Sequence, residues 1–343
     1  MGAVSSPSTP AVLRRPAAAD ASVDPTPSPI GFLTVIGAAA LFGMLGPLSR
    51  FAYDAGMQPA AFVAWRAGVA LVVLGVVIAW RVGRGSAVLL RFRSMPRRAQ
   101  VTLLIAALMG FSLNLAMFMA FDRITVALAL LGFYTYPAMI AVVNVVLGRE
   151  PLDRTRMIAL GLALAGMIAV VAAQLDPANG IRLDALGIGF ALGAALSQTV
   201  YVVVSRDGYP DVPTDQAIAV VLAVTVVGAS LLAILGGAPE TLAWPLVEPS
   251  VLPILVFTGV FAAAIPSLGF LRGIREIGSL RAGILMLFEP VVGVALAAWL
   301  LGETLGPVQI AGAVAILIAA ILLQRASRVG DPADAAVAIP GGP

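Results

Sequence analysis

The sequence predicts an all-α membrane protein with ten transmembrane helices, built as two inverted repeats of five helices each. Of the 343 residues, 60% are hydrophobic and 11% are charged, whereas a typical soluble domain has about 25% charged residues. The apolar residues fall into ten runs, each close to the roughly 20 residues needed to cross the hydrocarbon core. The two halves of the chain also resemble each other, so the ten runs divide into two sets of five.

The ends of the chain differ in composition from the part between them. Proline, alanine and serine dominate residues 1–30, and small and polar residues dominate 326–343. Segments of this kind cannot bury enough apolar surface to fold, so we expect both to be disordered cytoplasmic tails. Between them, the two predicted five-helix repeats cover residues 31–174 and 184–325.

The ten apolar runs define the predicted spans. Their connections are short, as at 148–155, and leave no room for a soluble domain. The spans lie at residues 31–52, 59–80, 100–121, 125–147, 156–174, 184–204, 214–236, 250–272, 278–301 and 307–325.

The basic residues predict the orientation of these spans. All 21 are arginines, and ten alternating spans place 17 of them on the side of the N-terminus and 3 on the other, with Arg66 inside a span. Positive residues accumulate on the cytoplasmic side of membrane proteins. We therefore expect a multi-pass protein of the inner (plasma) membrane with both termini in the cytoplasm. Because the arginines alternate between loops, their pattern favours a lipid bilayer and not nucleic acid as the partner.

An internal repeat becomes visible when the first half is shifted by 153 positions. Tyr136 then aligns with Glu289, each followed by a proline, and Asn114 aligns with Ser267. Because each half has an odd number of spans, the second half must enter the membrane from the opposite side. In secondary transporters, inverted repeats place the substrate site near the midplane between the halves. The alternative is a duplication that only produced a symmetric helix bundle.

Three motifs carry a resemblance to a known family. They are "LFGMLGPLSRFAYDAG" followed by "AWRAGVAL", then "YTYPAMIAVVNVVLGREPL", and finally "LFEPVVGVALAAWLLGETLGPVQIAG". In this order and spacing, the chain resembles the ten-span EamA-like transporter family of the drug/metabolite transporter (DMT) superfamily. The resemblance implies secondary active transport by alternating access, often export, of amino acids, related metabolites or amphipathic drugs, linked to protons or another gradient.

Residue types that are missing exclude several chemistries. The chain has no cysteine, histidine or lysine. Disulfides, Cys/His metal sites, histidine-based triads and Schiff-base lysines are therefore excluded, and we expect neither an enzyme nor a cofactor. An intramembrane enzyme, or a structural or sensory membrane protein that does not transport, remains the alternative to a carrier. The sequence also leaves a homodimer open.

Two ionisable residues lie within the predicted spans. Glu289 falls midway along the ninth span, and Arg66 falls inside the outer end of the second. Each costs about 2.5 to 3.5 kcal/mol at the bilayer centre, so such groups usually face a cavity or a partner. Glu289 is a candidate proton or cation site, or a carboxyl group satisfied by packing. Arg66 either extends to the interface or lines the cavity, where it would hold a carboxylate or pair with Glu289.

Neutral polar residues near mid-depth complete the predicted substrate site. Helical spacing places Gln198 and Tyr201 on one face, and it turns Tyr134 partly away from the face of Tyr136. Hydrogen bonding between helices is the alternative role for all of them. With Arg66 and Glu289, the predicted substrate-binding residues are Asn114, Tyr136, Gln198, Tyr201 and Ser267.

Small residues within the spans predict close helix packing. Gly189 and Gly193 form a GxxxG pattern in the sixth span, and Gly161 and Gly166 lie in the fifth. Small residues let transmembrane helices approach one another closely. Pro266 in the eighth span, like Pro47 in the first, predicts a kinked helix next to a cavity.

Overall fold

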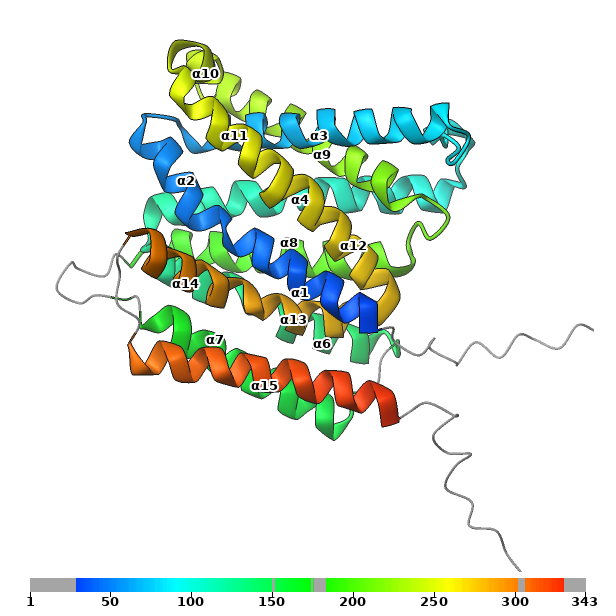
Figure 1. The fold of residues 1–343 in the computed structure, drawn as a ribbon, viewed down its shortest axis with the longest axis vertical. Helices are drawn as coiled ribbons and strands as arrows, with labels where there is room; N and C mark the ends of the chain where they lie inside the picture. Colours follow the sequence, from blue (N-terminus) through cyan, green and yellow to red (C-terminus); the bar gives the residue numbers. More distant parts are fainter. Residues whose placement is uncertain (1–28, 150–151, 174, 176–182, 302–305, 330–343) are drawn as a thin grey trace, which may run out of the picture.

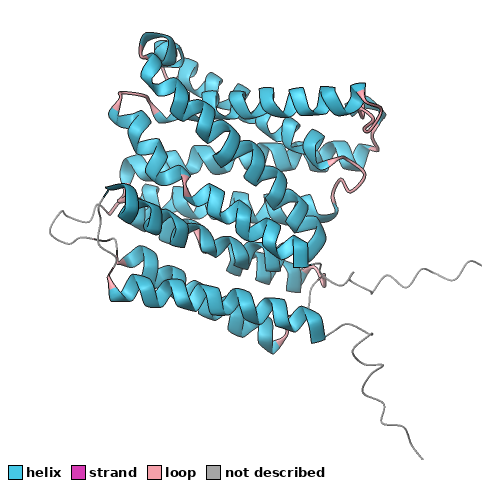
Figure 2. Cartoon of the chain, in the orientation of Figure 1, coloured by secondary structure: helices cyan, strands magenta, loops and turns pink. Residues whose placement is uncertain are grey.

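The computed structural model describes residues 29–149, 152–173, 175, 183–301 and 306–329 (Figure 1). All regular secondary structure in these ranges is helical (Figure 2). The predicted tails lie outside the described residues, except at their inner ends, where α1 begins at Pro29 and α15 continues to Val329.

Each half of the chain supplies five spans, some made of two helices. The first half contains α1 (Pro29–Gly43), α2 (Leu45–Asp54), α3 (Pro59–Gly83), α4 (Arg97–Arg123), α5 (Val126–Phe133), α6 (Tyr136–Val146) and α7 (Arg154–Ala172). The second contains α8 (Ala185–Asp207), α9 (Thr214–Leu235), α10 (Trp244–Val247), α11 (Leu252–Gly259), the π-helix η5 (Val260–Ala264), α12 (Ile265–Ile277), α13 (Ser279–Leu285), the 3₁₀ helix η6 (Met286–Phe288), α14 (Glu289–Leu301) and α15 (Pro307–Val329).

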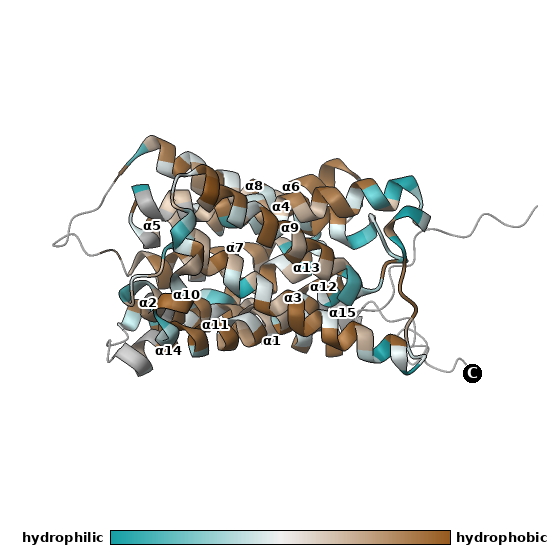
Figure 3. Ribbon diagram, turned by 90° about the horizontal axis from the view of Figure 1, so that it is seen from above, coloured by the Kyte–Doolittle hydropathy of each residue, from teal (hydrophilic) through white to brown (hydrophobic). Residues whose placement is uncertain are grey.

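The number of spans agrees with the sequence. Within the described residues, 9 helical segments are long and apolar enough to cross a membrane, and the shorter apolar α1 begins the remaining span. Apolar residues occupy the middle of the molecule, and hydrophilic residues concentrate at its two edges (Figure 3). The described chain begins and ends at the same edge (Figure 1), as an even number of crossings requires.

The contacts between the halves are symmetric. Helix α3 packs on its repeat partner α9, and α7 packs on its repeat partner α15, at opposite ends of the molecule (Figure 1). The pairs α4 with α8 and α12 with α1 are equivalent, as are α4 with α9 and α11 with α3. A pseudo-two-fold relation therefore connects the halves, and residues that are related by the repeat can meet near its axis.

Four spans are interrupted in the middle. Proline has no N–H, so the carbonyl four residues earlier loses its helical donor, and the helix bends or breaks there. In a bilayer such breaks occur where the freed groups find other partners inside the protein. Each interruption lies at the residue four positions before a proline. Ala262 (before Pro266) and Met286 (before Pro290) lie within η5 and η6, and Gly43 (before Pro47) and Phe133 (before Pro137) are the last residues of α1 and α5.

Glycine contacts only partly follow the predicted packing. A β-carbon at Gly166 would come within 2.5 Å of the Gly312 carbonyl oxygen, and the reverse substitution meets the Gly166 carbonyl oxygen at the same distance. Gly166 therefore sets the closest approach of α7 and α15. The expectation was wrong for Gly161, Gly189 and Gly193, where a β-carbon would find no atom within 4 Å. Their faces point away from neighbouring helices.

The contact between α7 and α15 gives a stability prediction. Gly166→Ala should destabilise the protein by about 1–3 kcal/mol, because the added methyl group meets backbone that cannot rotate away. Gly161→Ala, five residues earlier on the same helix, should cost nothing, because the site is open and alanine favours helix. Unfolding in detergent micelles measures both variants. Equal stability of the two would show that the helices separate without cost.

Candidate functional site

Arg66 on α3 is buried inside the helix bundle. Only 8% of the residue is exposed, and its guanidinium reaches two other helical segments. Nη1 donates to the Ala262 carbonyl oxygen at 3.1 Å, and Nη2 donates to Oδ1 of Asn114 at 3.3 Å. The interpretation in which Arg66 extends to the membrane interface is therefore wrong, since the side chain is turned toward α4 and η5.

The partner that Arg66 finds on η5 is explained by the sequence. Pro266 lacks the N–H that would bond the Ala262 carbonyl in a regular α-helix. The helix widens to a π-helix at this point, and the guanidinium donates to that carbonyl across the bundle. π-helical turns often occur at functional sites. Gly259 lets α3 approach, because a β-carbon there would lie 2.6 Å from the Val69 side chain.

Asn114 completes this first cluster. Its Nδ2 donates to the Gly110 carbonyl oxygen at 2.8 Å, which fixes the amide so that Oδ1 faces Arg66. The Nε atom of Arg66 is buried without a hydrogen bond. No carboxylate among the described residues forms an ion pair with Arg66. The guanidinium thus retains a free donor and has no counter-ion within the described part of the chain.

Glu289 is the first residue of α14 and is half-buried. The polar groups nearest to its carboxyl group are the side chains of Tyr134 and Tyr136, and both interact with it electrostatically. Tyr136 and Glu289, which the repeat aligns, therefore lie close together. Both tyrosines come from the first half and the carboxyl group comes from the second.

Tyr134 is the residue that the sequence argument assigned wrongly. Helical spacing turned it away from the face of Tyr136, but the helix ends at Phe133 and restarts at Tyr136. The rings of Tyr134 and Tyr136 both contact Phe133, with centroids 5.3 and 5.2 Å away. A proline one residue after Tyr136 was the signal that could have found this break.

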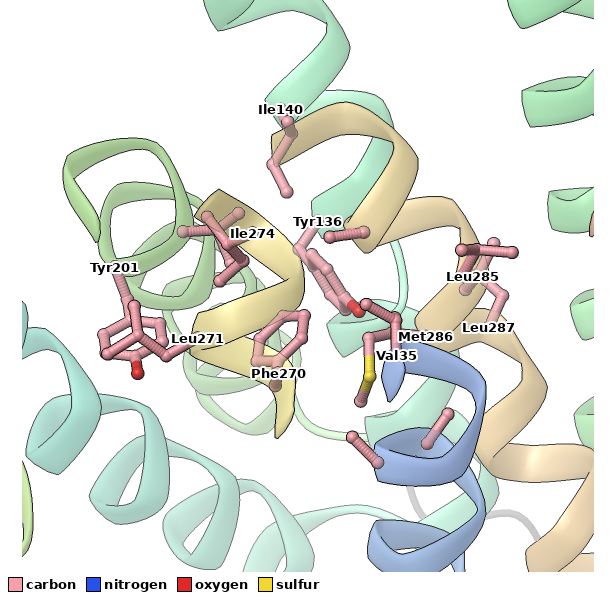
Figure 4. Close-up of a cluster of buried hydrophobic side chains, with 14 of the residues drawn as sticks. Val35, Tyr136, Ile140, Tyr201, Phe270, Leu271, Ile274, Leu285, Met286 and Leu287 are labelled. Carbon is pink, nitrogen blue, oxygen red and sulfur yellow. The ribbon is translucent and has the colours of Figure 1, made fainter. Parts of the chain in front are cut away.

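Tyr136 joins three helices. Its hydroxyl donates to the Gly283 carbonyl oxygen on α13 at 3.4 Å, and its own carbonyl accepts from the Thr199 hydroxyl on α8 at 3.4 Å. Figure 4 shows the hydroxyl directed toward Met286, with Phe270 on the other side of the ring. Only 1% of the residue is exposed, so its ring is part of the packed interior of the bundle. Its hydroxyl group already has a hydrogen-bond partner in the Gly283 carbonyl oxygen.

Tyr201 belongs to a different cluster. Leu271 and Ile274 of α12 separate it from Tyr136 (Figure 4). Its hydroxyl interacts with Ser205, whose own hydroxyl lies 2.6 Å from that of Tyr209. Burial raises the pKa of Tyr209, so this hydroxyl stays protonated. The predicted face shared with Gln198 therefore ends in a network of hydroxyl groups toward the end of α8.

Further members of that network come from α12. Arg275 lies over the Tyr209 ring with its guanidinium carbon 5.3 Å from the centroid. It also donates to the Tyr209 carbonyl oxygen at 3.1 Å and to the Val212 carbonyl oxygen at 2.9 Å. These contacts tie the end of α12 to the connection between α8 and α9.

Gln198 and Ser267 carry polar groups without protein partners. Gln198 is 7% exposed and Ser267 is half-buried, and neither side chain forms a hydrogen bond to a described residue. Both are thus available to water or to a polar ligand.

The predicted site residues therefore form separate groups and not one site. Arg66 lies with Asn114, and Glu289 lies with Tyr136, but the two groups share no hydrogen-bond partner and no ion pair joins Arg66 to Glu289. Within the described residues, no three acidic side chains come together in a way that could hold a metal ion.

Ten apolar spans in two symmetric halves, with polar residues buried in the middle, define a polytopic helical membrane protein of the transporter class. The sequence model of the EamA-like transporter family matches the chain twice, at residues 29–172 and 185–325. The chain belongs to this family, within the drug/metabolite transporter superfamily, whose members are transporters and not enzymes.

Curated proteins and solved structures were compared as well. No curated protein matches the chain. A protein of known crystal structure has a similar fold, with a TM-score of 0.67 and 22% sequence identity over 87% of this chain and 98% of the other. At this identity the likeness concerns the fold alone.

The pairing of Arg66 with the carbonyl freed by Pro266 can be tested by a double-mutant cycle. Arg66→Met should cost about 1 kcal/mol less in a Pro266→Ala background, because alanine supplies the missing N–H to Ala262. A cycle of Arg66→Met with Pro290→Ala is the control, since Pro290 frees a different carbonyl. Unfolding in micelles gives the coupling, and additivity in the Pro266 cycle would contradict the pairing.

Proposed function

We propose that this protein is a secondary active transporter that moves a small amino-acid-like or amphipathic metabolite by alternating access, coupled to protons, in the direction of export. The observation that carries the proposal is a pair of ionisable residues of opposite sign within the helix bundle, the buried Arg66 and the half-buried Glu289, neither of which has a counter-ion among the described residues. Family membership supports transport as such.

The two ionisable groups suit a zwitterionic cargo. Burying an ionisable group without a counter-ion is costly, so a ligand that supplies the opposite charge would gain what the protein lacks. The free Nε of Arg66 is a donor for a carboxylate, and the Glu289 carboxyl group is an acceptor for an ammonium group. The ring of Tyr136, next to Glu289, offers an apolar face.

The remaining polar residues have proposed roles around the two ionisable groups. Asn114 orients the guanidinium, and Tyr134 holds the carboxyl group of Glu289. Gln198 and Ser267 offer unpaired polar groups to the cargo. The hydroxyl network of Tyr201 lies apart from them, so we propose that it closes one end of the pathway and does not bind the substrate directly.

Coupling to protons rests on Glu289. Desolvation disfavours the charged form of a carboxyl group, so a buried carboxyl group can exchange protons when its surroundings change. Alternating access would change them, since Glu289 comes from the second half and its tyrosine partners come from the first. When the halves rock, this contact must shorten or lengthen.

Glu289→Gln tests the coupling in proteoliposomes that contain the purified protein. The variant should keep amino-acid counterflow but lose accumulation driven by a pH gradient, because the amide cannot carry the proton. Glu289→Asp should be intermediate, since its carboxyl group lies about one carbon short of the position. Glu240→Gln, at an exposed position in the connection before α10, is the matched control and should transport normally.

Two outcomes would contradict the proposal. Unchanged gradient-driven accumulation in Glu289→Gln would assign this residue to packing. Counterflow of hexose phosphates in place of amino acids would contradict the zwitterion, because a single buried arginine is a poor match for a doubly charged phosphate.

The orientation in the plasma membrane is a separate prediction. It rests on the arginine asymmetry and on the shared edge of the two ends of the described chain. Reporter fusions after Gly83, Arg154 and Arg328 should report the cytoplasm, and fusions near Asp54 and Glu240 should report the outside. A cytoplasmic signal near Glu240 would be incompatible with an inverted second half.

A further inference from the structure

The connection between α3 and α4 is strongly basic. No acidic residue occurs between Asp54 and Asp122. Arg84 stacks on Trp80 with its guanidinium carbon 4.3 Å from the ring centroid, and none of the exposed arginines here forms an ion pair with a described residue. The exposed arginines are Arg84, Arg91, Arg93, Arg97 and Arg98.

This connection has a fixed backbone. Gln216 on α9 accepts from the Leu90 N–H at 3.0 Å and donates to the Val88 carbonyl oxygen at 2.9 Å. Gln100 donates to the carbonyl oxygens of Phe92 and Met95 at 3.0 and 2.9 Å, which closes the 3₁₀ helix η1 (Phe92–Ser94). The arginines therefore project from an ordered segment, residues 84–98, which we call the platform.

An apolar cavity lies beside the same platform. Its volume is about 200 Å³, and its walls include Ile78, Phe92, Met95 and Val220. Leu89, which lines the cavity, is 59% exposed, and Val88, which precedes it in the sequence, is 77% exposed. Apolar side chains exposed beside guanidinium groups are unusual on a surface that faces water only, but they suit the headgroup level of a bilayer, where both environments meet.

We propose that this platform binds an anionic phospholipid, with the phosphodiester on Arg91 and Arg93 and one acyl chain reaching into the cavity. Arginine matches phosphate oxygens with two parallel hydrogen bonds, and arginines near a bilayer surface attract anionic lipids. A lipid fits better than a free phosphate because the cavity and Val88 offer apolar contact that a free ion cannot use.

The site also joins the two halves. The platform belongs to the first half, whereas Gln216 and Val220 belong to α9 of the second. Next to it, Arg81 of α3 forms an ion pair with Asp215 of α9 at 2.6 Å. A lipid bound here holds the ends of α3 and α9 together, independently of what the centre transports.

Thermal unfolding of the full chain in a neutral detergent tests the proposal. Short-chain phosphatidylglycerol should raise the unfolding temperature, and phosphatidylcholine of the same chain length should not. In Arg91→Gln/Arg93→Gln the midpoint of the phosphatidylglycerol titration should rise about 30-fold, as expected for two arginines near the surface. The control is Arg154→Gln/Arg325→Gln, which removes two exposed arginines elsewhere and should keep the wild-type midpoint.

A variant of the cavity separates the contribution of the acyl chain from that of the lipid headgroup. Val220→Phe fills the cavity and should weaken the binding of phosphatidylglycerol, although all arginines remain. An equal effect of phosphatidylcholine, or an unchanged midpoint in Arg91→Gln/Arg93→Gln, would overturn the proposal. Stabilisation by inorganic phosphate at the same concentrations would identify a free-anion site and would also overturn it.

Discussion

The structure depends on one constraint of the bilayer, which is that every backbone polar group must find its partner inside the protein. Four spans break this rule locally, because a proline removes the donor for a carbonyl one turn earlier. At Pro266 the solution is visible, since the Arg66 guanidinium donates to the freed carbonyl of Ala262. A charged residue that is costly in a membrane is thus held by a backbone group that would otherwise be unsatisfied.

The interruptions also explain where polar residues gather. The broken spans contribute Tyr134, Tyr136 and Glu289, and the π-helix contributes Ala262. The continuous spans α3, α4 and α8 contribute side chains that face these breaks. Because repeat partners pack around a pseudo-two-fold axis, the breaks of both halves meet at the centre. Sequence duplication therefore brings Tyr136 and Glu289 together without a local motif.

Much of this was predictable from the sequence, and the exceptions have physical reasons. Span number and the paired halves follow from hydropathy and the repeat, since both depend on long stretches of residues. The direction in which the Arg66 side chain points could not be predicted from the sequence, because α3 is apolar on all faces and its rotation is set by packing. Tyr134 was misplaced because helical spacing fails across a break. The GxxxG motif of Gly189 and Gly193 faces no neighbouring helix, so the motif alone does not specify a helix partner.

The separation of Arg66 from Glu289 constrains the proposed mechanism. If the two groups formed an ion pair, a zwitterion would have to break it before binding, at a cost of several kcal/mol for removing a partner from a buried charge. Instead each group lies beside a neutral partner: Arg66 donates to the carbonyl of Ala262, and the hydroxyl of Tyr134 is a polar neighbour of Glu289. Both partners lie at helix interruptions, so a ligand that replaces them frees the segments that can bend most easily. Binding and movement are then linked at the same two breaks.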